Sequence, residues 1–302
     1  MNALIHSQLS ITIPSPLERI RPQWRNAKDY TLWVKRDDLI HPIISGNKWR
    51  KLMPMLDQIT TAKQHGVASF GGGYSNHIHA LGYICYRLNI PFYAVIRGDY
   101  AHNLTPMLRD IIAWGTKIIY VTKIEYQRRT DPQYQAQLQH RLRVSVIIPE
   151  GGSAQGHFVG MQQLHDEITT KLDLLVCPLA SGGTLAGLAL SEGKIKALLG
   201  VAVLKGPDYL SKLVKGLLSK GPKTPYTLTH EHHFNGYAKA PAELQMFCQQ
   251  MEQQLAIPFE PVYSGKALHA FKHVVESGQF PVGSQLALLH TGGLQGARPS
   301  QC

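Results

Sequence analysis

The sequence predicts an α/β protein built on parallel β-sheets, and three observations support this fold class. Short β-rich segments alternate with longer helical segments along the 302 residues. The β-rich segments are continuous apolar runs, which is typical of parallel strands that helices cover on both faces. The length exceeds what one hydrophobic core usually serves, so two domains or one large α/β unit are expected.

The first half of the chain contains four runs that predict strands, because each is short and apolar. Ser75 is expected to cap a helix that continues through Leu88, and another helix is expected near residues 106–114. The four predicted strands are residues 67–70, 92–97, 117–121 and 144–148.

The second half of the chain continues the same alternation. Three buried strands are expected at residues 173–179, 200–204 and 285–290. Residues 205–223 form an amphipathic pattern whose lysines suit the exposed face of a helix. Polar or glycine-rich loops follow several strands, and ligands bind beyond the carboxyl ends of strands in open α/β sheets. Chemistry is therefore expected in these loops.

Composition favours a folded globular protein, since 44% of the residues are hydrophobic and only 17% are charged. The net charge is +11, but the basic residues are scattered, and no nucleic-acid partner is expected. The four cysteines lack the spacing of a disulfide scaffold, and Cys85 and Cys177 are expected to be buried thiols. With no leader-like or membrane-spanning segment expected, a cytoplasmic protein is the default.

Lys48 is the first candidate for chemistry. It lies between the Gly46-Asn47 turn and the start of an apolar helical pattern. An amine at a helix N-terminus is harder to protonate, because the helix dipole opposes the positive charge. Lys48 is therefore a candidate nucleophile, while the alternative is a solvated surface lysine.

The loop at residues 180–187, Ala-Ser-Gly-Gly-Thr-Leu-Ala-Gly, is a candidate anion site. It joins a predicted strand to an apolar helix, so backbone N–H groups and the hydroxyls of Ser181 and Thr184 can bind a phosphate. It matches neither the Walker loop nor the Gly-x-Gly-x-x-Gly pattern, which favours a phosphorylated cofactor smaller than a nucleotide. A purely structural turn is the alternative.

A second glycine-rich loop, at residues 70–77, also joins a strand to a helix. Ser75 can cap this helix, which is the usual role of serine at this position. Ser75, Asn76 and His77 can equally donate to oxygen atoms of a ligand. Both roles stay open from the loop alone.

Taken together, the motifs resemble those of the 1-aminocyclopropane-1-carboxylate deaminase/D-cysteine desulfhydrase family. This resemblance implies a pyridoxal-phosphate enzyme with two open twisted parallel-sheet domains of the tryptophan-synthase-β type, fold type II. The matches occur in the family's order from Lys48 to Gly293. They are Ser45-Gly-Asn-Lys48-Trp-Arg-Lys-Leu, Gly72-Gly-Tyr-Ser75-Asn76-His77, Ser181-Gly-Gly-Thr184, Pro261-Val-Tyr263-Ser264-Gly-Lys266-Ala and Leu289-His290-Thr291-Gly292-Gly293.

The resemblance implies that Lys48 binds pyridoxal 5'-phosphate covalently and moves protons after the substrate amine displaces it. Asn76 would bind the ring hydroxyl of the cofactor. Ser75 and His77, together with Asn76, would bind the carboxylate of a small amino-acid substrate, and Ser75 counts among the catalytic residues.

The remaining cofactor contacts follow from the same resemblance. Thr291 would reach the pyridine nitrogen, where a hydroxyl makes the ring a weaker electron sink than a carboxylate does. The phosphate would be bound by Ser181, Gly182, Gly183 and Thr184.

Two tyrosines match catalytic tyrosines of the family. Tyr263 would act as an acid or base or stack near the cofactor, and a core tyrosine with a satisfied hydroxyl is the alternative. Tyr237, in Asn235-Gly-Tyr-Ala-Lys239, is a shorter match.

Ser264 affects the expected substrate. The cyclopropane-opening deaminases have a glutamate after the matched tyrosine, whereas this chain has Ser264, which is counted among the cofactor-binding residues. The change favours elimination of sulfide and ammonia from D-cysteine, giving pyruvate. Cyclopropane opening to α-ketobutyrate is the alternative, and a catalytically inactive ligand-binding protein is an alternative of another class. A dehydrogenase or nucleotide-dependent enzyme is disfavoured by the missing motifs.

The resemblance also implies the domain organisation. A larger cofactor-binding domain would contain residues 1–50 and 152–302, and a smaller inserted domain would contain residues 51–151. The family is typically dimeric, so a homodimer is expected. No metal site is expected, because the segment Thr229-His-Glu-His-His233 lacks the His-Glu-x-x-His spacing and is interpreted as a polar loop.

Overall fold

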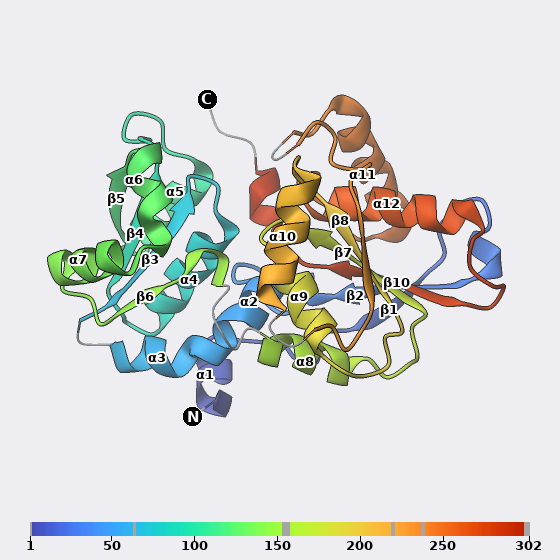
Figure 1. Cartoon of the computed structure of the whole chain (residues 1–302), viewed down its shortest axis with the longest axis horizontal. Coiled ribbons are helices and arrows are strands. Elements are labelled where there is room, and N and C mark those ends of the chain that lie inside the picture. Colours follow the sequence, from blue (N-terminus) through green and yellow to red (C-terminus); the bar gives the residue numbers. More distant parts are fainter. Residues whose placement is uncertain (1, 63–64, 153–157, 219–220, 237–238, 299–302) are drawn as a thin grey trace. The chain divides into compact units, whose positions relative to one another are not determined.

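The structure is a computed structural model that describes residues 2–62, 65–152, 158–218, 221–236 and 239–298 (Figure 1). Two compact units divide the chain. Unit 1 contains the described residues of 1–12, 41–157 and 298–302, and unit 2 contains residues 13–40 and the described residues of 158–297.

Unit 2 is built on a six-stranded sheet with the strand order β1-β2-β10-β7-β8-β9. Only β1 runs antiparallel to its neighbour, and all other pairs are parallel. Five of the strands enter long-range parallel pairings because helical segments separate them along the chain. The strands are β1 (Leu17–Ile20), β2 (Thr31–Arg36), β7 (Leu174–Leu179), β8 (Leu198–Ala202), β9 (Tyr226–Thr229) and β10 (Gln285–His290).

Helices cover both faces of this sheet, since side chains of each strand alternate between two apolar clusters. Leu174 and Val176 of β7 pack with α11 and α12, whereas Leu175 and Cys177 pack with α8, α9 and α10. Every residue of β7 is buried, as expected for a central parallel strand. The helices are α8 (Phe158–Glu167), α9 (Gly183–Leu190), α10 (Pro207–Leu217), α11 (Ala242–Leu255) and α12 (Ser264–Ser277).

Unit 1 is built on a four-stranded parallel sheet with the order β5-β4-β3-β6. Phe70 and Val95 contribute to an apolar cluster that packs under α6 and α7. The strands are β3 (Val67–Gly72), β4 (Phe92–Arg97), β5 (Lys117–Val121) and β6 (Val146–Ile148). The helices are α1 (Asn2–Gln8), α2 (Gly46–Leu52), α3 (Leu56–Thr61), α4 (Asn76–Arg87), α5 (Pro106–Ala113), α6 (Lys123–Gln127) and α7 (Pro132–Leu142).

The predicted fold class is confirmed, with two parallel-sheet α/β units. The predicted strands at residues 92–97, 117–121 and 285–290 coincide with β4, β5 and β10, while β8 begins two residues before the predicted 200–204. The strands β1, β2 and β9 were absent from the prediction. The predicted boundaries of the two domains, at 50/51 and 151/152, stay a prediction.

Two further predictions concern side chains and membranes. Cys85 and Cys177 are buried, as predicted, and burial raises the pKa of Cys85. Cys302 lies outside the described residues. In the part of the chain that the structure describes, no helix is both long and apolar enough to span a bilayer.

Candidate active site

Lys48 is the third residue of α2, a helix that begins directly after an unusual backbone conformation. Ser45, the N-cap residue, has φ 63° and ψ −176°, a region that is ordinarily occupied by glycine. Holding a serine in this region costs about 1–3 kcal/mol, so the surrounding fold must enforce it. Such strain is concentrated at functional sites, and here it directs the chain into the helix that carries Lys48.

The amine of Lys48 is easier to deprotonate than an ordinary lysine. Its side chain is only partly exposed, and burial lowers the pKa of the Lys48 amine to about 8. Burial acts in this direction because it removes the water that stabilises the ammonium form. A substantial fraction of the amine is therefore neutral near physiological pH, which is what a nucleophile requires.

Helix α4, in the same unit, begins at the second glycine-rich loop. The Oγ of Ser75 accepts a hydrogen bond from the N–H of Ile78 at 3.2 Å, so Ser75 is the N-cap. The loop needs its glycine, because a Cβ at Gly71 would lie 2.5 Å from Ile78 and 2.8 Å from Ser75. Asn76 is the first residue of the helix. The predicted capping role of Ser75 is confirmed, and the ligand-binding roles of Ser75 and Asn76 stay predictions.

His77 is buried and bonded to the neighbouring strand. Its Nε2 lies 2.8 Å from the Oγ of Ser69, which itself donates to the carbonyl of Ile148 at 2.7 Å. Ser69 therefore accepts from His77, and the proton of the neutral ring lies on Nε2. Burial and the charges of Lys48 and Lys51 lower the pKa of His77 to about 3.

The remaining ring nitrogen of His77 is an acceptor. The Nδ1 atom is buried and has no hydrogen-bond partner among the described residues. In this tautomer the ring has no N–H left for a substrate carboxylate. The predicted carboxylate contact of His77 stays a prediction, and the structure adds a positioning contact with β3.

The candidate phosphate loop lies in unit 2, between β7 and α9. Gly182, the N-cap residue of α9, has φ 76°, and no side chain caps the helix there. A Cβ at Gly182 would approach Leu217 to 3.2 Å, so a larger residue would disturb both the backbone and the packing. The first N–H groups of α9 have no intrahelical acceptors, and Thr184 places a buried hydroxyl in the same turn. This donor set suits a phosphate.

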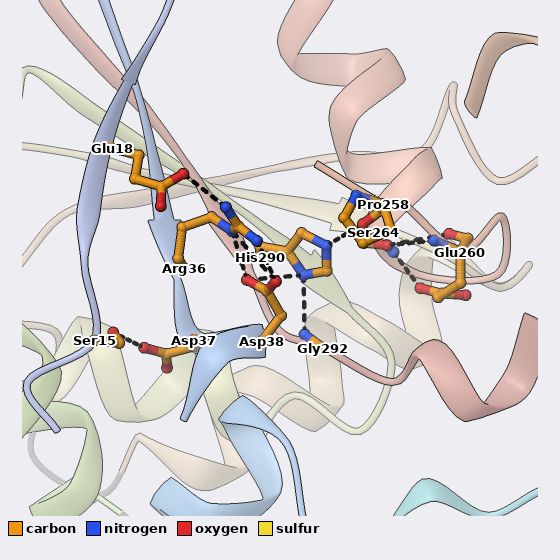
Figure 2. Close-up of polar contacts among 10 residues, drawn as sticks. All are labelled: Ser15, Glu18, Arg36, Asp37, Asp38, Pro258, Glu260, Ser264, His290 and Gly292. Carbon is orange, nitrogen blue, oxygen red and sulfur yellow. Dashed lines mark hydrogen bonds and ion pairs between the residues drawn. The ribbon is translucent and has the colours of Figure 1, made fainter. Parts of the chain in front are cut away.

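Thr291 follows β10 and is buried, and the residues beside it belong to a chain of polar contacts (Figure 2). The Nε2 of His290 donates to the carbonyl of Pro258 at 2.7 Å, and its Nδ1 accepts from the N–H of Gly292 at 3.1 Å. The ring is therefore neutral, in agreement with the pKa of His290, which burial lowers. His290 thus fixes the backbone on both sides of Thr291.

Charged side chains from the N-terminal part of the chain lie beside His290 (Figure 2). The guanidinium of Arg36 pairs with Asp38 at 2.8 Å and with Glu18 at 2.6 Å, and Asp38 lies 3.7 Å from the Nδ1 of His290. Hydrogen bonds and charges from both carboxylates raise the pKa of Arg36, although burial opposes this. The two ion pairs therefore favour the charged form of Arg36.

Ser264 begins α12, where the chain supplies its own anion. The carboxylate of Glu260 accepts from the N–H groups of Val262, Tyr263 and Ser264 at 2.7, 2.9 and 2.6 Å. The Oγ of Ser264 accepts from the N–H of Glu260 at 3.0 Å and donates to its carbonyl at 3.1 Å. Ser264 is therefore tied to the Glu260 turn (Figure 2), and its predicted contact with the cofactor stays a prediction.

The two tyrosines differ in what the structure describes. Tyr263 is half-buried at the start of α12, and its N–H is bonded to Glu260. Tyr237 lies outside the described residues. Both catalytic roles stay predictions.

The sequence did not predict a role in the site for three residues, Glu260, His290 and Arg36. Glu260 is 1% exposed, and burial raises its pKa to about 7. One signal was available: the run Lys35-Arg-Asp-Asp38 directly follows an apolar segment, and charged residues at the end of a strand are unusual unless they are paired.

Comparison with known proteins gives the family of the chain. Residues 10–292 match the family model described as "Pyridoxal-phosphate dependent enzyme". The "Bifunctional D-cysteine desulfhydrase/1-aminocyclopropane-1-carboxylate deaminase, mitochondrial" of Arabidopsis thaliana is 27% identical over 94% of this chain and 77% of its own length.

Two further proteins are similar to this chain, one in sequence and one in structure. A "D-cysteine desulfhydrase" of Serratia proteamaculans is 24% identical over 92% of this chain and 91% of its own length. A solved structure described as an "ACC deaminase homologue" has a TM-score of 0.79 at 24% identity, covering 98% of this chain and 97% of that chain.

Proposed function

Because the chain belongs to the family of pyridoxal-phosphate dependent enzymes, we propose that it is a D-cysteine desulfhydrase-like lyase. It is an enzyme, and its cofactor is pyridoxal 5'-phosphate. The proposed reaction breaks the Cβ–S and Cα–N bonds of D-cysteine and consumes one water, giving pyruvate, hydrogen sulfide and ammonia. One relative carries both activity names and another carries the D-cysteine desulfhydrase name alone, which supports this substrate class.

The residues of the chain fit this cofactor by the chemistry of their donors. Lys48 would bind its aldehyde carbon, since the lowered pKa of this amine favours the neutral nucleophile. The N-terminus of α9, with Ser181 and Thr184, would bind the phosphate. Thr291 would contact the pyridine nitrogen, and Asn76 the ring hydroxyl. The bound cofactor supplies an electron sink for the electron pair left when the substrate loses its α-proton.

The chain itself binds the substrate and moves its protons. The first turn of α4 would hold the substrate carboxylate, because the helix N-terminus favours negative charge. Once the substrate amine has displaced it, the Lys48 amine would take the α-proton. Tyr263 would donate a proton to the departing sulfur.

Ser264 is the observation that favours D-cysteine over the cyclopropane amino acid. The matched position is a glutamate in the cyclopropane-opening deaminases, whereas here the Ser264 hydroxyl is bonded to the backbone of Glu260. The nearby carboxylate of Glu260 accepts from three backbone N–H groups. Neither side chain provides the carboxylate that the ring-opening branch has at this position.

The test compares two substrates on the purified holoenzyme. Pyruvate and sulfide are measured from D-cysteine, and α-ketobutyrate is measured from 1-aminocyclopropane-1-carboxylate. Turnover of D-cysteine with weaker or no α-ketobutyrate release is expected. Activity on the cyclopropane amino acid alone would overturn the proposal, and cofactor binding with neither activity would favour an inactive ligand-binding protein.

The proposal extends to the organisation of the enzyme. Residues 1–50 and 152–302 would form the larger cofactor-binding domain and residues 51–151 the smaller one, and a homodimer acting in the cytoplasm is proposed. Light scattering on the eluted holoenzyme tests the dimer, with a mass of one chain as the contradicting result.

A further inference from the structure

Three histidines of unit 2 form a cluster that the lyase reaction does not use. His269 and His273 lie one turn apart on α12, so both project from the same face of the helix. His232 comes from the segment that follows β9. The cluster, defined as His232, His269 and His273, brings together residues from two separate parts of the chain.

The ring nitrogens of the cluster converge. One nitrogen of each histidine lies within 4.8 Å of the others, and the Nδ1 atoms of His232 and His269 are 3.1 Å apart. The ring centroid of His273 lies 5.0 Å from the ring centroid of His232 and 4.8 Å from that of His269. In a tetrahedral zinc site, Zn–N bonds of ~2.0–2.1 Å place the ligand nitrogens about 3.3 Å apart. The Nδ1 atoms of His232 and His269 already have about this separation, and a nitrogen of His273 lies within 4.8 Å of both rings.

A hydrogen bond links the Nδ1 atoms of His232 and His269, so one of these two rings donates and the other accepts. A neutral imidazole has a lone pair on one nitrogen, and moving the proton to the other nitrogen frees Nδ1 as a ligand. His232 is 9% exposed and His273 is exposed, so the cluster is anchored in the protein and open on one side.

We propose that His232, His269 and His273 bind a Zn²⁺ ion, with the fourth coordination position taken by water. Imidazole nitrogen suits Zn²⁺, whereas Mg²⁺ and Ca²⁺ prefer oxygen ligands. Three protein ligands with an open position form a recognised zinc arrangement. The site is separate from the residues assigned to the cofactor.

A bound ion would fasten the segment after β9 to α12. Lys266, also on α12, already donates to carbonyl groups of this segment, at 2.9 Å to His233 and 2.8 Å to Gly236. The ion would add a second attachment one turn further along the helix. Zinc binding is therefore expected to stabilise the folded chain, since it binds the native arrangement of three side chains.

The experiment uses holoenzyme that has been treated with a chelator and freed of unbound cofactor. Zinc content is measured by atomic spectrometry after equilibrium dialysis against Zn²⁺. Wild-type protein is expected to bind one Zn²⁺ per chain, and His273→Ala, which removes the exposed ligand, is expected to weaken binding by at least about tenfold. His102→Ala is the matched control, because His102 is an exposed histidine outside the cluster.

A second readout is thermal unfolding. Excess Zn²⁺ is expected to raise the Tm of wild type and of His102→Ala by about 3 °C or more, with little change in His273→Ala. Mg²⁺ at the same concentration is expected to leave the Tm unchanged. No retained zinc, or equal zinc binding in wild type and His273→Ala, would overturn the proposal. Activity on D-cysteine is expected to survive in His273→Ala, so this test is independent of the proposed reaction.

Discussion

The N-termini of α9 and α12 differ in what lies next to their first backbone N–H groups. Every helix begins with N–H groups that have no intrahelical acceptor and carry partial positive charge. In α12 the chain fills this position itself, with the carboxylate of Glu260. In α9 the N-cap is Gly182, which has no side chain.

This difference indicates that the N-terminus of α12 has a structural role, whereas the N-terminus of α9 is suited to binding a ligand. At α12 the buried side chain of Glu260 accepts hydrogen bonds from three backbone N–H groups, so these groups already have a partner within the chain. A glycine at α9 leaves room for an external anion to approach the backbone. Changes at α9 and at Lys48 should therefore affect the cofactor, whereas changes at Glu260 should affect stability.

Replacing Lys48 by alanine should have the largest effect. Lys48→Ala removes the covalent attachment, and sulfide release from D-cysteine is expected to fall at least about a thousandfold. Equilibrium dialysis should still detect pyridoxal phosphate, because the N-terminus of α9 is unchanged. Lys123→Ala, at an exposed lysine, is the control. Complete loss of cofactor binding in Lys48→Ala would contradict the proposal that α9 binds the phosphate independently of the covalent bond to Lys48.

The pH dependence of reconstitution sharpens the role of Lys48. Because burial lowers the pKa of Lys48 to about 8, the protonated amine predominates below that pH. The neutral fraction rises from about 1% at pH 6 to about 50% at pH 8, so the attachment rate should rise about 50-fold and then level off. Stopped-flow absorbance on the apoenzyme measures this rate. A rate that keeps rising tenfold per pH unit up to about pH 10 would indicate an ordinary exposed lysine.

Two glycine-to-alanine substitutions test whether the N-terminus of α9 binds the phosphate. Gly182→Ala and Gly221→Ala both place an alanine at positive φ, 76° and 72°, which costs about 1–2 kcal/mol. Only the Cβ at position 182 meets neighbours, whereas nothing lies within 4 Å at Gly221. In denaturant titrations both variants should lose the stability that the backbone strain costs, and Gly182→Ala should lose more because its Cβ also meets Leu217. Cofactor affinity should fall about tenfold or more in Gly182→Ala alone, because relieving the contact with Leu217 displaces the backbone N–H groups that are proposed to bind the phosphate. Equal affinities would refute the assignment to α9.

The smallest effect is expected at the filled helix end. Burial raises the pKa of Glu260 to about 7, so the folded protein holds this proton more tightly than the unfolded chain. The resulting stability is complete below the ordinary glutamate pKa of about 4.3 and is lost as the pH rises through about 7. Glu260→Gln lacks this titration.

Thermal unfolding between pH 5 and pH 8 checks this expectation. Relative to Glu260→Gln, the Tm of wild type should fall by about 3 °C or more over this range. Cofactor affinity should differ less than about threefold between the two proteins at each pH, because Glu260 acts within α12. A relative Tm that rises with pH would contradict the direction of the pKa shift.

Several strands were predictable because their signals are local. The strands β4, β5 and β10 are apolar runs bounded by polar or turn residues, and periodicity alone marks them. The strand β2 escaped prediction because it ends in Lys35 and Arg36. These charges are buried only because Glu167, 2.6 Å from Lys35, and the carboxylates around Arg36 pair with them.

The candidate site was also predictable in part. Lys48, Ser75 and the glycines of the phosphate loop lie in short motifs, since each works through its own turn of backbone. The tautomer of His77 was not predictable, because it depends on Ser69 and Ile148, the latter 79 residues away along the chain from Ser69.

The sequence by itself determined the α/β class, the order of the loops and the lysine and glycines expected to meet the cofactor. Those features depend on neighbours within one strand or turn, so their signals survive in the linear order of residues. Only the tertiary structure decided that Glu260 caps α12, that His290 fixes the backbone around Thr291, and that His232 meets His269 across 37 positions. Two of these contacts, His290 with Pro258 and His232 with His269, join segments 32 and 37 positions apart. Burial, which raises the pKa of Glu260 and lowers that of His290, also exists only in the folded chain.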